Sequence, residues 1–281
     1  MNRGFELPPA LPLGEQRGQT FVKLVELMQR LLAPDGCPWD REQDMASMRR
    51  FVLEEACEVI DAIDDQDAEQ LKEELGDLAL QVVFLAELAR KEAGFGPDDV
   101  VRAVCDKLVR RHPHVFEDLT VTDSKQVLAN WEAIKRAEKT GRRVLDGVPR
   151  SMPALSRAQR MSDKVSRVGF DWPDASGSEA KVDEEVIELK EAIASGSRDA
   201  MEHELGDLFF ALVNLARHHQ IDAEGALRRA TERFRTRFEH VEDRVRELHG
   251  GFPTDESGKP GAGIALEELD GYWNEAKEQS R

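Results

Sequence analysis

The sequence predicts an all-α fold built from tandem helical repeats, each forming a four-helix-bundle unit. Three observations support this. Leu, Ala, Glu and Arg are abundant while aromatic residues make up 6% of the 281 positions, a composition that favours helix. No stretch shows the period-two alternation of a half-buried strand. Residues 54–86 also align with residues 184–216 without a gap, which indicates an internal repeat.

Apolar residues recur at helical spacing through the first half of the chain, between clear stop signals. The first helix should end at the turn Ala33-Pro34-Asp35-Gly36, and Asp67 should cap the third. The second should turn Phe51, Val52, Ala56, Val59, Ile60 and Ile63 inward, and the third Leu71, Leu75, Leu78, Val82, Leu85 and Leu88. The expected helices span about 15–33, 42–64, 67–92, 98–111 and 123–139.

The pattern begins again after a segment rich in Pro, Gly and charge, TGRRVLDGVPRSMPAL, which is typical of a domain linker. Helices are expected at about 155–167, 178–195, 197–219, 222–249 and 264–279. Between the last two lies GGFPTDESGKPGAG, which predicts a mobile loop. The predicted organisation is therefore a flexible N-terminus (1–14), an N-terminal domain (15–139), a linker (140–154) and a C-terminal domain (155–281).

Charge and cysteine content restrict the possible partners and compartment. The formal net charge of -17 argues against a nucleic-acid coat or an anionic membrane surface as partner. No apolar run approaches the ~18 residues of a membrane span, and no signal-peptide core precedes the first prolines. Three cysteines, none in a CxxC pair, predict free thiols in a reducing cytosol. We expect a cytoplasmic protein.

The repeat preserves pairs of acidic residues while its turn changes almost completely. Thirteen of the 33 aligned positions are identical, whereas the turn reads DDQDAEQ in one copy and ASGSRDA in the other. Carboxylates three residues apart share a helix face, where like charges repel unless a cation lies between them. Oxygen ligands suit a hard divalent ion. The pattern predicts metal sites made of Glu55, Glu58, Glu74 and Asp77, and of Glu185, Glu188, Glu204 and Asp207.

Basic and aromatic residues also recur in both copies, with shifted offsets. Lys107 and Arg111 correspond to Arg233 and Arg237 at an offset of 126, and Trp131 and Lys135 correspond to Trp273 and Lys277 at an offset of 142. Pairs four residues apart put two side chains on one helix face. Each half thus supplies acids for a metal, cations for phosphates and one Trp for a planar base or for packing.

Gly76 and Gly206 interrupt helices beside the acids, at a cost of about 1 kcal/mol each relative to alanine. They indicate either close approach of a helix or ligand, or simple packing.

This constellation resembles the all-α nucleoside triphosphate pyrophosphohydrolase superfamily, and within it the MazG family. The resemblance covers nearly the whole chain from about residue 20. It rests on the ExxE and ELGD motifs of both repeats, the tandem arrangement, the closing Trp-x-x-x-Lys and three further segments: Cys37-Pro38-Trp39-Asp40, Arg110-Arg111-His112-Pro113-His114-Val115-Phe116 and Val168-Gly169-Phe170-Asp171-Trp172.

The resemblance implies hydrolysis of nucleoside triphosphates to the monophosphate and pyrophosphate, with broad base specificity, required Mg²⁺ and a homodimer. It assigns the two acid sets to metal binding. It assigns phosphate contacts to Arg233, Arg237 and Lys277 and a place near the nucleotide to Trp273, with Lys107, Arg111, Lys135 and Trp131 as the first-repeat counterparts. In this family the C-terminal repeat carries the activity, although both acid sets are complete here.

Some features stay open. The family's phosphate-contacting lysine is replaced by Ala200, and His203 or Arg198 is a possible substitute. Glu54 and Glu184 are the spare carboxylates to test as general base. The alternatives are a narrower hydrolase acting on dUTP or phosphoribosyl-ATP, a nucleotide-sensing module with little turnover, and a purely structural helical scaffold.

Overall fold

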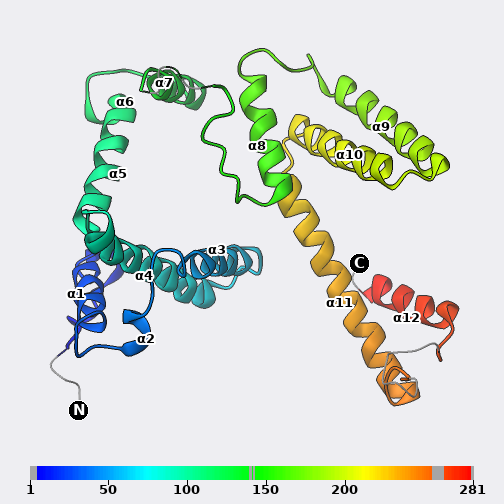
Figure 1. Ribbon diagram of the computed structural model, residues 1–281, viewed down its shortest axis with the longest axis horizontal. Coiled ribbons are helices and arrows are strands. Elements are labelled where there is room, and N and C mark those ends of the chain that lie inside the picture. Colours follow the sequence, from blue (N-terminus) through cyan, green and yellow to red (C-terminus); the bar gives the residue numbers. More distant parts are fainter. Residues whose placement is uncertain (1–4, 139–140, 142, 255–262, 280–281) are drawn as a thin grey trace. The chain divides into compact units, whose positions relative to one another are not determined.

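The computed structural model describes residues 5–138, 141, 143–254 and 263–279, and it divides into two compact units, Met1–Thr140 and Gly141–Arg281. The elements in the described ranges are helices, with no β-strand among them (Figure 1). This confirms the predicted all-α class.

The first unit centres on a hairpin of two antiparallel helices, α3 (Arg49–Asp64) and α4 (Ala68–Glu92). The Asp67 side chain accepts hydrogen bonds from the backbone N–H groups of Glu69 and Gln70, which confirms the predicted cap of α4. The other elements are a 3₁₀ turn (Leu13–Glu15), α1 (Phe21–Leu31), α2 (Pro38–Arg41), α5 (Pro97–Arg111), α6 (Pro113–Phe116) and α7 (Ser124–Ala137).

The second unit contains the matching hairpin, α9 (Ala175–Ser195) and α10 (Arg198–His218). Gly196 ends α9 in the left-handed conformation with φ 71°, and the Ser197 side chain then caps α10. Helix α8 (Ala154–Ser166) packs against α10 and α11 (Ala223–His249), and α12 (Leu266–Gln279) lies along α11 (Figure 1).

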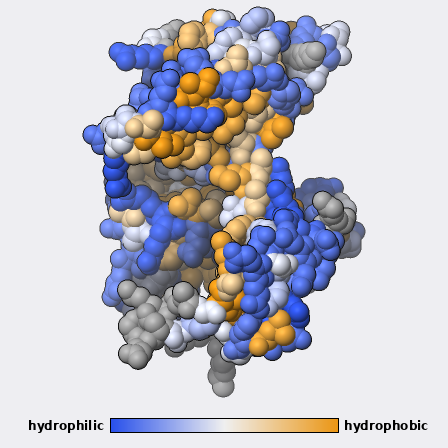
Figure 2. Space-filling view, turned by 90° about the vertical axis from the view of Figure 1, so that its right-hand side faces the viewer, coloured by the Kyte–Doolittle hydropathy of each residue, from blue (hydrophilic) through white to orange (hydrophobic). Residues whose placement is uncertain are grey.

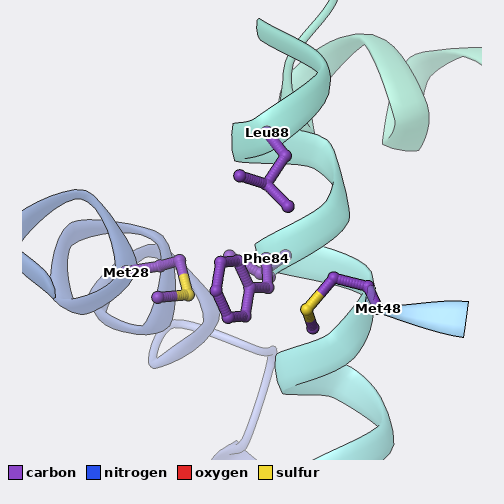
Figure 3. Packing of buried hydrophobic residues seen from close by; sticks show 5 residues of the cluster. Met28, Met48, Phe84 and Leu88 are labelled. Carbon is purple, nitrogen blue, oxygen red and sulfur yellow. The ribbon is translucent and has the colours of Figure 1, made fainter. Parts of the chain in front are cut away.

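Each unit has its own small core. In the first, Met28 from α1 and Met48, just before α3, meet Phe84 and Leu88 on α4 (Figure 3). In the second, Val241 and Val245 on α11 pack with Tyr272 on α12, and partly buried residues, Trp273 among them, border the cluster. These cores fix α1 on α4 and α12 on α11, and thereby position the ends of the hairpin and the Trp-bearing helix.

Replacing Phe84 with alanine should destabilise the first unit by about 3–5 kcal/mol, because the ring is only 3% exposed and touches the core from both sides. Denaturant unfolding monitored by circular dichroism would measure the loss. The matched variant Phe95→Ala removes a ring that is 42% exposed and should cost much less. Equal losses in the two variants would contradict this assignment of the core.

Several predicted boundaries and faces were wrong. The first helix begins at Phe21 rather than near residue 15. Helix α3 begins at Arg49 rather than near residue 42, since residues 42–48 form an irregular segment and a turn after α2. The short α6 was not predicted. Four residues expected to face inward are 40–56% exposed, because no helix among the described residues of their unit covers that side of the hairpin: Ile60, Ile63, Leu75 and Val82.

The three cysteines, Cys37, Cys57 and Cys105, carry free thiols, as predicted. Among the described residues, no helix is both long and apolar enough to cross a membrane. The predicted flexible N-terminus and the predicted Gly-rich loop lie partly outside the described ranges, at residues 1–4 and 255–262.

Candidate functional site

The helix hairpins bring carboxylates from two helices together in both units. In the first, Glu55 and Glu58 on α3 meet Glu74 on α4, and one oxygen of each lies within 4.8 Å of the others. In the second, Glu185, Glu188 and Glu204 form the same arrangement across α9 and α10. The i,i+3 spacing and the antiparallel hairpin therefore produce the two clusters that the sequence predicts.

The fourth predicted ligand of each set lies beside its cluster, outside the group of closest oxygens. The Asp77 charge is near enough to influence Glu58 and Glu74. Asp207 Oδ2 instead lies 3.4 Å from His203 Nε2, one turn away on α10. His203, a candidate substitute for the missing phosphate-contacting lysine, is thus paired with a predicted metal ligand.

Burial and neighbouring carboxylates raise the pKa of members of both clusters. Burial raises the pKa of Glu58, and the charges of Glu55 and Glu54 raise it further. Burial, followed by the charge of Glu58, likewise raises the pKa of Glu74. In the second unit burial and then the charge of Glu185 raise the pKa of Glu188. Like charges held together in this way are the condition that a bound cation relieves.

The residues present fit a divalent cation. Glu185 is 4% exposed, and its Oε2 atom is buried without a hydrogen-bond partner. A buried, unpartnered carboxylate oxygen is unfavourable, and a metal ion would satisfy it. In the first unit, Gln81 Nε2 donates to Glu55 Oε1 at 3.2 Å, while Gln81 Oε1 stays buried without a partner.

A lysine that the sequence analysis missed accompanies the second cluster. Lys181 Nζ lies 2.7 Å from Glu185 Oε1 and donates to Glu184 Oε1 at 2.8 Å. Its hydrogen bonds to Glu184 and Glu185 raise the pKa of the Lys181 ammonium. The aligned residue of the first repeat is Phe51, so this cation distinguishes the two clusters. Its position one turn before Glu185 was the available signal.

The predicted cations and tryptophans also meet in pairs, on other helices. In the first unit, Arg111 lies over the Trp131 ring at 5.4 Å and Lys135 at 4.7 Å, measured to the ring centroid. In the second unit, Arg237 lies over the Trp273 ring at 5.9 Å. Lys107 lies on α5, Arg233 on α11 and Lys277 on α12, which are the helices of these pairs.

Each unit therefore holds its acids on one helix hairpin, α3–α4 or α9–α10, and its cation–tryptophan pair on a second helix pair, α5–α7 or α11–α12 (Figure 1). Gly76 and Gly206 sit next to the acids, and a Cβ added to either would meet nothing within 4 Å. Close packing within the unit is thus not the reason for these glycines, and the space beside them is open.

The comparisons with known proteins agree with this arrangement. The family model described as "MazG nucleotide pyrophosphohydrolase domain" matches twice, at residues 43–116 and 178–242. The Escherichia coli K12 protein named nucleoside triphosphate pyrophosphohydrolase is 43% identical over 265 residues, covering 92% of this chain and 97% of its own. A Thermotoga maritima protein, named nucleoside triphosphate pyrophosphohydrolase/pyrophosphatase MazG, is 42% identical, covering 94% of this chain and 98% of its own.

A third relative matches a shorter stretch. The Mycobacterium tuberculosis protein named nucleoside triphosphate pyrophosphohydrolase is 39% identical over 157 residues, which cover 55% of this chain and 47% of its own. The first two relatives match along nearly their whole length, and both acidic clusters lie inside the two matched segments. The chain belongs to the MazG nucleotide pyrophosphohydrolase family, with two copies of its domain.

Proposed function

We propose that this protein hydrolyses nucleoside triphosphates, both ribo- and deoxyribonucleotides with broad base specificity, to the monophosphate and pyrophosphate. The single observation that carries the proposal is the pair of three-carboxylate clusters at aligned positions. The names of the two full-length relatives support the same activity.

Magnesium is the metal that we propose for these clusters. The ligand sets would be Glu185, Glu188, Glu204 and Asp207, and Glu55, Glu58, Glu74 and Asp77. A bound Mg²⁺ neutralises phosphate charge and holds substrate oxygens in place. The unpartnered Glu185 oxygen supports such an ion in the second unit.

The cations would bind the triphosphate and each tryptophan would lie near the base. A guanidinium offers a planar fork of N–H donors that matches phosphate oxygens, so Arg237 and Arg111 are suited to hold the chain of phosphates in line. Arg233, Lys277, Lys107 and Lys135 add charge on the same helix pairs, and Trp273 and Trp131 offer flat apolar surfaces. In a protein of net charge -17, these local cations are required to attract a polyanion.

Glu184 and Glu54 are the proposed general bases, each next to a proposed ligand in sequence. A carboxylate there would accept a proton from the attacking water. The water oxygen would then add to a phosphorus of the α–β anhydride while the bond from that phosphorus to the bridging oxygen breaks, which leaves the monophosphate and pyrophosphate. Glu184 is exposed and accepts a hydrogen bond from Lys181.

A homodimer is the proposed assembly. Large apolar side chains are exposed on the hairpin helices of both units. Apolar patches lie open on the face shown in Figure 2. The same faces of the two hairpins are uncovered at aligned positions: Ile63 and Ile193, Leu75 and Leu205, Val82 and Leu212.

The remaining assignments are also proposals. We propose a cytoplasmic protein that acts without nucleic-acid or membrane partners, with domains at residues 15–139 and 155–281 joined by a linker at 140–154. The acidic net charge supports the absence of nucleic-acid and membrane partners. The division of the chain after Thr140 supports the two domains.

An assay of the full chain against a panel of nucleotides tests the function. Pyrophosphate should be released from NTPs and dNTPs with Mg²⁺, should stop with a chelator and should resume when Mg²⁺ is restored. The panel should include dUTP and phosphoribosyl-ATP, because turnover of one of these alone would favour the narrower hydrolase. Tight binding of Mg-nucleotide without product would instead favour the sensing module.

A further inference from the structure

In the first unit, a carboxylate of the protein already binds Arg111, the arginine of the proposed phosphate site. Glu138, just after α7, accepts hydrogen bonds from two consecutive arginines of α5. Its Oε2 atom lies 2.5 Å from Arg111 Nη2 and 3.1 Å from Arg111 Nε, and its Oε1 atom lies 2.6 Å from Arg110 Nε. The carboxylate thus fills the guanidinium fork that a phosphate would use.

The contact is partly shielded from water. The side chain of Arg111 is 11% exposed and that of Glu138 is 19% exposed, while Arg110 stays 57% exposed. Hydrogen bonds from Arg111 and Arg110 lower the pKa of Glu138 to about 2, so the group is a carboxylate at neutral pH. The Trp131 ring lies under Arg111 and Lys135, which places this clamp directly beside the proposed base-binding surface.

The second repeat lacks this carboxylate. Trp131 and Lys135 align with Trp273 and Lys277 at an offset of 142, and the same offset aligns Glu138 with Ser280, which carries no charge. Among the residues that the structure describes, Arg233 and Arg237 form no ion pair with a carboxylate. Arg237 Nε is instead buried without a hydrogen-bond partner. Arg111 is therefore paired with a carboxylate in the first unit, whereas the Nε atom of its counterpart Arg237 has no hydrogen-bond partner in the second unit.

We propose that Glu138 is an internal competitor for phosphate, which weakens triphosphate binding in the first unit. A triphosphate reaches Arg111 only by displacing the carboxylate of Glu138, which is held in place at the end of α7. The inference rests on the proposed function, since it assigns unequal strengths to two sites for the same class of ligand.

The test measures phosphate binding to the first unit of the full chain. The background variant Arg233→Gln/Arg237→Gln/Lys277→Gln removes the three proposed phosphate cations of the second unit. Binding of inorganic tripolyphosphate with Mg²⁺ is then measured by calorimetry, with and without Glu138→Gln. Loss of the clamp should tighten binding about tenfold, because two charge-assisted hydrogen-bonding partners become available to phosphate. Glu138→Ala should give the same gain, and circular dichroism should show unchanged helix content.

The matched control is Glu92→Gln, which removes one negative charge from an exposed position at the end of α4. Little change in this variant, together with a gain in both Glu138 variants, would support the clamp over a general charge effect. Equal binding in all variants, or no binding in any, would overturn the proposal. Pyrophosphate release by the unmodified chain is measured in parallel, so a failure of the proposed function is recognised separately from a failure of the clamp.

Discussion

Replacing Glu74 and Glu204 together with glutamine should lower pyrophosphate release by at least about a hundredfold. These two residues are the α4 and α10 members of the three-carboxylate clusters, so the double variant changes both proposed metal sites. Glutamine keeps nearly the same size but removes the charge that a divalent ion requires. The assay is pyrophosphate release from a nucleoside triphosphate with saturating Mg²⁺.

The control for this experiment is the variant Glu69→Gln/Asp199→Asn. It neutralises two carboxylates on the same two helices at positions outside the clusters, and it should retain turnover. The two single variants show how much of the pyrophosphate release each unit contributes. If Glu138 weakens the first site, the Glu204→Gln variant alone should cause most of the loss. Near-wild-type turnover in the Glu74→Gln/Glu204→Gln protein would rule out the clusters as the metal sites.

The sequence was sufficient to predict the helix hairpins and most members of the acidic clusters. Both depend on local rules, since i,i+3 spacing fixes a shared helix face and a capped turn fixes the antiparallel return. The repeat then added a comparison within one chain, in which acids such as Glu58 and Glu188 persisted while the turn changed. Recurrent position, rather than acidity alone, separated these residues from the many other surface carboxylates.

The same reasoning could not predict contacts between segments that lie far apart in the sequence. Glu138 lies 27 residues from Arg111, and nothing in the periodicity of either helix joins them. The prediction that Leu75 and Val82 face inward was wrong for a related reason. Periodicity identifies the residues that share a face but not the element that covers it. Both side chains belong to an apolar stripe, and within the chain that stripe remains about half exposed.

The uncovered stripe leads to a prediction about assembly. Leu205, Phe209 and Leu212 recur at i, i+4 and i+7 on α10 and are 42–52% exposed. If a second copy covers this face, the variant Phe209→Asp/Leu212→Asp would place two charges in the dimer interface, at a cost of several kcal/mol. Light scattering should then give the mass of one chain, 31.7 kDa, in place of twice that mass for the unmodified protein.

A matched control separates assembly from a general effect of added charge. The variant Val168→Asp/Phe170→Asp makes the same kind of change at two residues after α8 that are 59% and 79% exposed, and it should remain dimeric. Retained helix content in both variants would show that the change in mass is not caused by unfolding. A dimeric Phe209→Asp/Leu212→Asp protein would place the interface elsewhere. An unmodified chain with a mass of 31.7 kDa in solution would contradict the homodimer itself.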